Sequence, residues 1–211
     1  MGQLLLVGLA GFLACLVDGA LGMGFGPTAS SILLGAGLSP AAASTTVNLA
    51  KVVTGLASAL SHWRFGNVDR SLVLRLAIPG MVGAIIGVTV LANVDGDALR
   101  PILAALLLVI GVRILIRYSR LAPVTAATAA ADEAAHQAEP IPTWNSRGTE
   151  VAATAGGVTN GLIGAWGPVV TPFLLQRGLP PRFAIGSVNT AEVAVAVVAS
   201  GSLLASLGGE E

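Results

Sequence analysis

The chain carries one pattern twice: VDGALGMGFGPTASSILLGAGLSPAAASTTVNLAKVV at residues 17–53, and VTNGLIGAWGPVVTPFLLQRGLPPRFAIGSVNTAEVA at residues 158–194. The offset is 141 positions, and between residues 14 and 52 it aligns fifteen identities in 39 positions without a gap. Apolar bias alone would match Leu, Val and Ala. It would not match the turn residues and the amide that also coincide: Gly26-Pro27 with Gly167-Pro168, Gly37-Leu38 with Gly178-Leu179, Pro40 with Pro181, and Asn48 with Asn189. The pattern therefore predicts an internal structural repeat.

The composition is that of a membrane protein. Of the 211 residues 54% are hydrophobic and 10% are charged, and the mean hydropathy is +0.82. A soluble domain has about 25% charged residues. The eleven basic and eleven acidic residues balance, which argues against a nucleic-acid partner. One cysteine, two distant histidines and the lack of catalytic motifs argue against an enzyme and against a metal or other cofactor.

The apolar stretches predict an all-α polytopic membrane protein. They fall at residues 3–21, 25–37, 41–61, 72–92, 98–117, 149–164, 167–177 and 182–206. The longer ones approach the roughly 20 residues that cross a hydrocarbon core of about 30 Å. Segments 25–37 and 167–177 are too short and predict broken half-helices. Either each completes a crossing with its neighbour, or it turns back as a re-entrant hairpin.

The basic residues predict the orientation. Nine of the eleven can lie in the cytoplasm together if the N-terminus is outside: Arg64, Arg70, Arg75, Arg113, Arg117, Arg120, Arg147, Arg177 and Arg182. Arg100 then lies outside and Lys51 lies within a span. This topology gives the two copies opposite orientations, so we expect an inverted-topology repeat.

Three regions follow from these patterns. Residues 1–120 form a first transmembrane repeat, residues 121–147 a flexible cytoplasmic linker, and residues 148–211 a second repeat. The offset would place counterparts of the fourth and fifth stretches beyond Glu211, at roughly 213–258, so the second repeat is expected to be incomplete. Either the chain is a fragment, or a second protomer in a homo-oligomer supplies what is missing.

The glycine-proline breaks are candidate substrate sites. Gly24, Gly26 and Gly167 allow close approach to the backbone, and a proline opens each half-helix. The positive end of a half-helix attracts anions, so the expected ligand is a small anion, to which Thr28 and Thr171 would add hydroxyl groups. Alternatively, the glycines serve close helix packing, the role expected for three others in the fourth stretch. Those three are Gly80, Gly83 and Gly87.

Two ionisable residues occupy equivalent positions of the repeat. Lys51 and Glu192 each lie near the middle of a span, where a charge costs at least about 2.5 kcal/mol and requires a partner or a wet cavity. Lys51 would attract the anion, and Glu192 would exchange protons or hold Lys51; a purely structural ion pair is the alternative. Asn48 and Asn189 would bind substrate oxygens or link helices. Asp18 would be a cation or proton site, or lie near the membrane surface.

Two quoted segments resemble a known transporter family. The run GALGMGFGPTASSILLGAGLSPAAASTTVNLAKVVTGLASALSHWRFGNVD, residues 19–69, resembles the sulfite exporter TauE/SafE family, including its closing HWRFGNVD. The corresponding run of the second copy, GLIGAWGPVVTPFLLQRGLPPRFAIGSVNTAEV at residues 161–193, is similar to the second-half signature of that family. The resemblance implies an exporter or permease of the bacterial inner (plasma) membrane for sulfite, an organosulfonate or a related small anion. The carboxylates make proton coupling the expectation. The alternatives are a passive anion channel and a truncated, non-transporting subunit.

Overall fold

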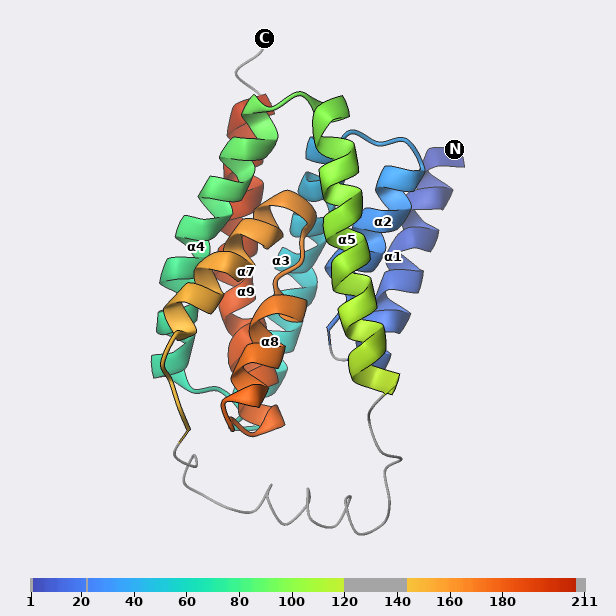
Figure 1. Cartoon of the computed structure of the whole chain (residues 1–211). Coiled ribbons are helices and arrows are strands. Elements are labelled where there is room, and N and C mark those ends of the chain that lie inside the picture. Colours follow the sequence, from blue (N-terminus) through green and yellow to red (C-terminus); the bar gives the residue numbers. More distant parts are fainter. Residues whose placement is uncertain (1, 22, 120–143, 208–211) are drawn as a thin grey trace.

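All regular structure in the described part of the chain is helical. The computed structural model describes residues 2–21, 23–119 and 144–207. The helices, shown in Figure 1, are α1 (Gly2–Leu21), α2 (Phe25–Gly35), α3 (Pro40–Arg64), α4 (Arg70–Asn93), α5 (Gly96–Ser119), α7 (Thr149–Ile163), α8 (Gly167–Gln176) and α9 (Pro181–Leu207). The predicted all-α membrane fold is confirmed, because α4, α5 and α9 each contain a segment long and apolar enough to cross a membrane.

Helices α2 and α8 are short, as the sequence predicts, with 11 and 10 residues. At about 1.5 Å per residue, each covers roughly half of a hydrocarbon core. The chain turns back between α7 and α8, since the Asn145 N–H just before α7 donates to the Arg177 carbonyl just after α8 at 3.2 Å. Figure 1 shows both ends of this hairpin at the same end of the molecule. The second half-helix is therefore part of a re-entrant hairpin.

The two short helices end in turns of the same geometry. Gly37 and Gly178 have φ angles of 92° and 90°, a region that glycine enters without steric cost. The next residue in each turn, Leu38 or Leu179, donates its N–H to the carbonyl five residues earlier, at 3.1 and 3.2 Å. Pro40 and Pro181 then begin α3 and α9. These turns lie 141 residues apart and support the predicted repeat.

Helices α4 and α7 pack through a seam of glycines. A Cβ atom on Gly157 would overlap the carbonyl of Gly80 and lie 2.9 Å from the nitrogen of Ala84. A Cβ on Gly83 would overlap the carbonyl of Thr154, so the backbones touch with no room for side chains. Such small residues let helices approach closely in lipid. The packing role expected for the glycines of the fourth stretch is confirmed here.

Trp166 fixes the second break inside the core. Its side chain is fully buried, and its indole Nε1–H donates to the carbonyl of Val188 in α9 at 3.1 Å. Gly80 and Gly156 leave room for the indole ring, because a Cβ on either would lie within 3.3 Å of its carbon atoms. The break at Gly167-Pro168 is therefore held by α4, α7 and α9 together.

Helices α3 and α9 lie side by side and run in opposite directions (Figure 1). The α3–α4 loop, the α8–α9 loop and the end of α5 all lie at one end of the molecule, whereas the α2–α3 and α4–α5 loops lie at the other. This distribution agrees with the grouping of arginines in the sequence. Of the expected linker, residues 121–143 lie outside the described residues, and Trp144 packs partly buried against the core.

Candidate functional site

A polar cavity of about 80 Å³ lies where the two helix breaks meet α3 and α9. It is large enough for a few water molecules or one small oxyanion. Its walls come from both copies of the repeat and consist of Asp18, Met23, Gly24, Phe25, Gly26, Lys51, Thr54, Gly55, Ser58, Gly164, Gly167, Pro168, Asn189 and Glu192. Segments far apart in the chain thus build one polar site.

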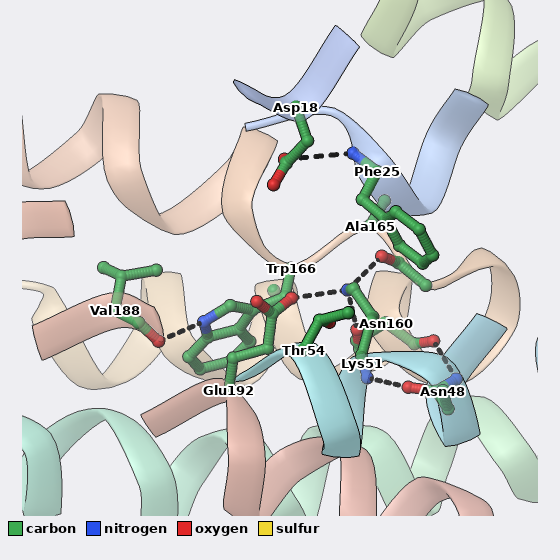
Figure 2. Close-up of polar contacts among 12 residues, drawn as sticks. Asp18, Phe25, Asn48, Lys51, Thr54, Asn160, Ala165, Trp166, Val188 and Glu192 are labelled. Carbon is green, nitrogen blue, oxygen red and sulfur yellow. Dashed lines mark hydrogen bonds and ion pairs between the residues drawn. The ribbon is translucent and has the colours of Figure 1, made fainter. Parts of the chain in front are cut away.

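Lys51 is the central side chain of this site. It lies in α3, is 5% exposed, and forms an ion pair with Glu192 of α9 (Figure 2). Its ammonium also donates to Asn160 Oδ1 at 2.9 Å and to the carbonyl of Gly164. An ammonium has three N–H donors, and these three acceptors match them. The approach of Lys51 to Glu192 that the repeat predicts is confirmed.

The carbonyl end of α7 receives hydrogen bonds from α2 and α3. The last carbonyls of a helix have no partner within the helix and carry the negative end of its dipole. At this end of α7, four carbonyls accept from side chains of the other copy: Ile163 from Ser30, Gly161 from Ser44, Asn160 from Asn48, and the C-cap Gly164 from Lys51. The Asn160 carbonyl also accepts the N–H of Gly164 at 2.8 Å. Lys51 is therefore both a cation at a helix C-terminus and a wall of the cavity.

Asn160 and Asn48 form a buried amide pair behind Lys51. Asn160 Nδ2 donates to Asn48 Oδ1 at 2.7 Å, and both side chains are fully buried. Asn48 Nδ2 donates back to the Asn160 carbonyl at 3.3 Å and to the Ser44 carbonyl at 3.0 Å. The amide of Asn48 thus links α3 to α7, the helix-linking alternative of the sequence analysis.

The two breaks touch each other beside Lys51. A Cβ atom on Gly26 would overlap the carbonyl of Gly164, so only glycine allows this approach of backbone to backbone. Gly164 ends α7 with a φ of 68°, in the left-handed region that favours glycine. Here the glycines serve close packing and line the cavity as well.

The starts of the two half-helices differ in charge. Asp18 Oδ1 accepts the N–H of Phe25 at 3.1 Å, so a carboxylate already lies at the positive end of α2. The equivalent residue before α8 is Thr159, whose hydroxyl donates to the Ala165 carbonyl at 2.8 Å. Trp166, the N-cap of α8, makes no capping hydrogen bond with its side chain. The start of α8 faces the cavity without a carboxylate of this kind.

The residues predicted from sequence separate into two groups. Seven of them line the cavity: Asp18, Gly24, Gly26, Lys51, Gly167, Asn189 and Glu192. Asn48, Thr28 and Thr171 do not line it, and Thr171 is 2% exposed within α8. Asn189 donates to Ser58 Oγ at 3.0 Å across the cavity wall.

Asn160 is the residue that the sequence analysis missed. Asn160 lies in the apolar stretch 149–164, and a polar side chain in a membrane span needs a partner, as Lys51 does. The comparison of the two copies did not reveal Asn160, because its counterpart in the first copy is Gly19. Among the described residues there is also no group of three His, Cys, Asp or Glu side chains that could hold a metal ion.

Comparison with known proteins gives the family. The sequence model of the family described as "Sulfite exporter TauE/SafE" matches residues 7–210. The chain belongs to the TauE/SafE family. One relative, the "Probable membrane transporter protein YtnM" of Bacillus subtilis (strain 168), is 41% identical over 212 residues, an alignment that covers 100% of this chain and 67% of the relative. No solved structure matches this chain. Membership of this family and the similarity to this relative indicate a membrane transporter and not an enzyme, as the sequence analysis predicts.

Proposed function

We propose that the protein is a secondary transporter that moves a small sulfur-containing anion, such as sulfite or an organosulfonate, across the bacterial plasma membrane and that this transport is coupled to protons. The observation that carries this proposal is the Lys51 ammonium in the wall of a small polar cavity, paired with Glu192. A buried cation beside a cavity is the group that an oxyanion requires. The family name supports sulfite as the class of substrate.

The bound anion lies between Lys51 and the start of α8. The glycines at the two breaks allow the anion to approach the backbone, and the positive end of α8 faces the cavity next to Gly167. Asn189 and Ser58 supply hydrogen bonds to substrate oxygens. Asp18 already occupies the start of α2, which makes the two half-helices unequal partners for the substrate.

The coupled protons bind to carboxylates in the cavity wall. The charged residues that line the cavity are Lys51, Asp18 and Glu192, one cation and two acids, so the ionised site carries an excess negative charge. An anion can bind beside Lys51 only when a carboxylate is neutralised, because uncompensated charge in a span is costly. Glu192 takes up this proton, releases Lys51 and leaves its place to the anion. Binding of anion and proton is thereby coupled.

The orientation follows the positive-inside rule. The end of the molecule that carries the α3–α4 and α8–α9 loops faces the cytoplasm, and the N-terminus lies outside. Residues 1–120 and 148–211 form the two halves of an inverted repeat around the cavity, joined by a linker over 121–147. Opposite orientation of the halves is supported by the antiparallel course of α3 and α9.

Flux measurements in proteoliposomes test the proposal. Uptake of sulfite, sulfoacetate, sulfate and chloride is measured with and without a pH gradient, and counterflow is measured with sulfite on both sides. We expect sulfur-anion uptake that depends on the gradient and shows counterflow. Flux without gradient dependence and without counterflow would identify a passive channel. If none of the anions gives a measurable flux, the chain is a subunit that needs a partner.

Replacement of Glu192 with Gln separates coupling from transport. One pH unit corresponds to about 1.4 kcal/mol, so it can drive about tenfold accumulation for each coupled proton. In Glu192→Gln we expect this accumulation to disappear while sulfite counterflow persists, because a neutral side chain leaves Lys51 free for the anion. Glu150→Gln, an exposed acid in the first turn of α7, is the matched control and should accumulate sulfite like the wild type. Normal gradient-driven accumulation by Glu192→Gln would refute the role of Glu192.

A further inference from the structure

The three partners of the Lys51 ammonium are not equivalent. Asn160 Oδ1 and the Gly164 carbonyl are neutral, and both belong to the carbonyl end of α7, which α2 and α3 hold in place. Glu192 is charged, and its side chain is 15% exposed at the cavity. Protonation removes the attraction of Glu192 and leaves the two neutral acceptors as they are. Two donors of Lys51 therefore stay occupied when the third becomes free.

Asn160 has the geometry needed to keep the ammonium in the cavity during this exchange. Its side chain is fully buried, and its own amide nitrogen is engaged with Asn48 Oδ1 at 2.7 Å. That hydrogen bond fixes which end of the Asn160 amide faces Lys51, so the oxygen at 2.9 Å is its acceptor. A buried amide with both ends engaged cannot rotate away without leaving polar groups unpaired.

We propose that Asn160 is a positioning residue of the transport site, which holds the Lys51 ammonium at the end of α7 so that a single N–H is offered to an oxygen of the anion when Glu192 is protonated. This inference rests on the proposed function and extends it by a residue outside the cavity wall. Without Asn160 the ammonium would follow Glu192 or turn toward other carbonyls. The affinity for the anion would then fall, and the dependence on pH would change.

The charged and titratable groups that face Glu192 at the cavity come from two other helices, Asp18 from α1 and Lys51 from α3. The changes at Asn160 leave both of these groups in place. Asn160→Leu removes the acceptor and keeps the branching of the side chain, whereas Asn160→Asp puts a second carboxylate beside Lys51. The two variants therefore act on the same ammonium in opposite electrostatic directions.

The test measures the KM and maximal rate of sulfite uptake, and its pH profile, in proteoliposomes of the full chain. For Asn160→Leu we expect KM to rise about 10- to 100-fold, the effect of losing a hydrogen bond to a charged group, with a smaller change in maximal rate. For Asn160→Asp we expect the pH profile to move toward lower pH, because a second carboxylate at Lys51 must also be neutralised before the anion binds.

Ser30→Ala is the matched control. The Ser30 hydroxyl donates to the Ile163 carbonyl at 2.8 Å, so this variant also loosens the end of α7, but it does not touch Lys51. We expect its KM and pH profile to match the wild type. If Ser30→Ala reproduces the changes seen in the Asn160 variants, or if both Asn160 variants keep the wild-type KM and pH profile, the positioning role is refuted.

The outcome also separates this inference from the proposed function. A wild-type protein that transports no sulfite refutes the proposed function, and the inference fails with it. A wild type that transports sulfite, with Asn160 variants indistinguishable from it, refutes the inference alone. If Asn160→Leu does not fold, the pH profile of Asn160→Asp decides, since a carboxylate keeps the shape of the side chain and an acceptor oxygen toward Lys51, although it loses the N–H donated to Asn48 Oδ1.

Discussion

Sulfite uptake falls to background, about 100-fold or more below the wild-type rate, when Lys51 is replaced with Met. The physical reason is that the ammonium is the cation among the residues that line the cavity, and its charge-assisted hydrogen bonds have no substitute in a thioether. Met keeps the length of the side chain and suits a membrane span, so insertion should persist. The measurement is initial uptake in proteoliposomes, normalised to the amount of inserted protein.

Stability must be separated from function in this experiment. Removal of one partner of a buried ion pair costs about 3–5 kcal/mol, because the other charge is left unpaired. The double variant with Lys51→Met and Glu192→Gln leaves no charge in the pair, so we expect its thermal stability to return toward that of the wild type. Its transport should remain absent. If uptake returns with stability, the ion pair is purely structural, which is the alternative that the sequence left open.

Arg100→Met is the matched control for charge. Arg100 is an exposed cation whose pairing partner, Asp97, lies one turn away in α5 at 3.5 Å. An exposed pair of this kind contributes about 0–1 kcal/mol, so both stability and uptake should stay close to the wild type. Unchanged transport in Lys51→Met would overturn the assignment of the central site.

Gly157→Leu is expected to prevent correct packing of α7 on α4. A Cβ atom on Gly157 would overlap the backbone of α4, so the helices would have to move apart along their whole seam. Overpacking of this kind costs about 1–3 kcal/mol, and more where backbone rather than a flexible side chain must move. We expect a large loss of monodisperse protein and a lower melting midpoint in detergent, measured by size-exclusion chromatography with a thermal challenge.

Gly111→Leu is the control for this variant. A Cβ on Gly111 in α5 meets no atom within 4 Å, so the same change of residue type adds bulk without a clash. Its yield and melting midpoint should equal those of the wild type. Equal behaviour of the two leucine variants would show that the contact between α4 and α7 does not hold the fold together.

The sequence by itself determined the helical membrane fold, the two short helices and the equivalent positions of Lys51 and Glu192 in the repeat. These features depend on local signals: apolar length, glycine and proline at fixed positions, and a repeat whose offset aligns two charges. Such signals act within a helix or a turn, so they are readable before any packing is known. The turns at Gly37 and Gly178 illustrate this, since the same residues give the same φ angle twice.

Only the tertiary structure decided that α7 and α8 form a re-entrant hairpin and that Asn160 contacts Lys51. The charge pattern is the same for a crossing and a hairpin, whereas one backbone hydrogen bond between Asn145 and Arg177 distinguishes them. Lys51 and Asn160 are 109 residues apart and belong to different helices, and the repeat gives Asn160 no amide counterpart. Contacts of this kind depend on how two helix surfaces fit together, here through glycines between α4 and α7, and periodicity along one chain carries no information about that fit.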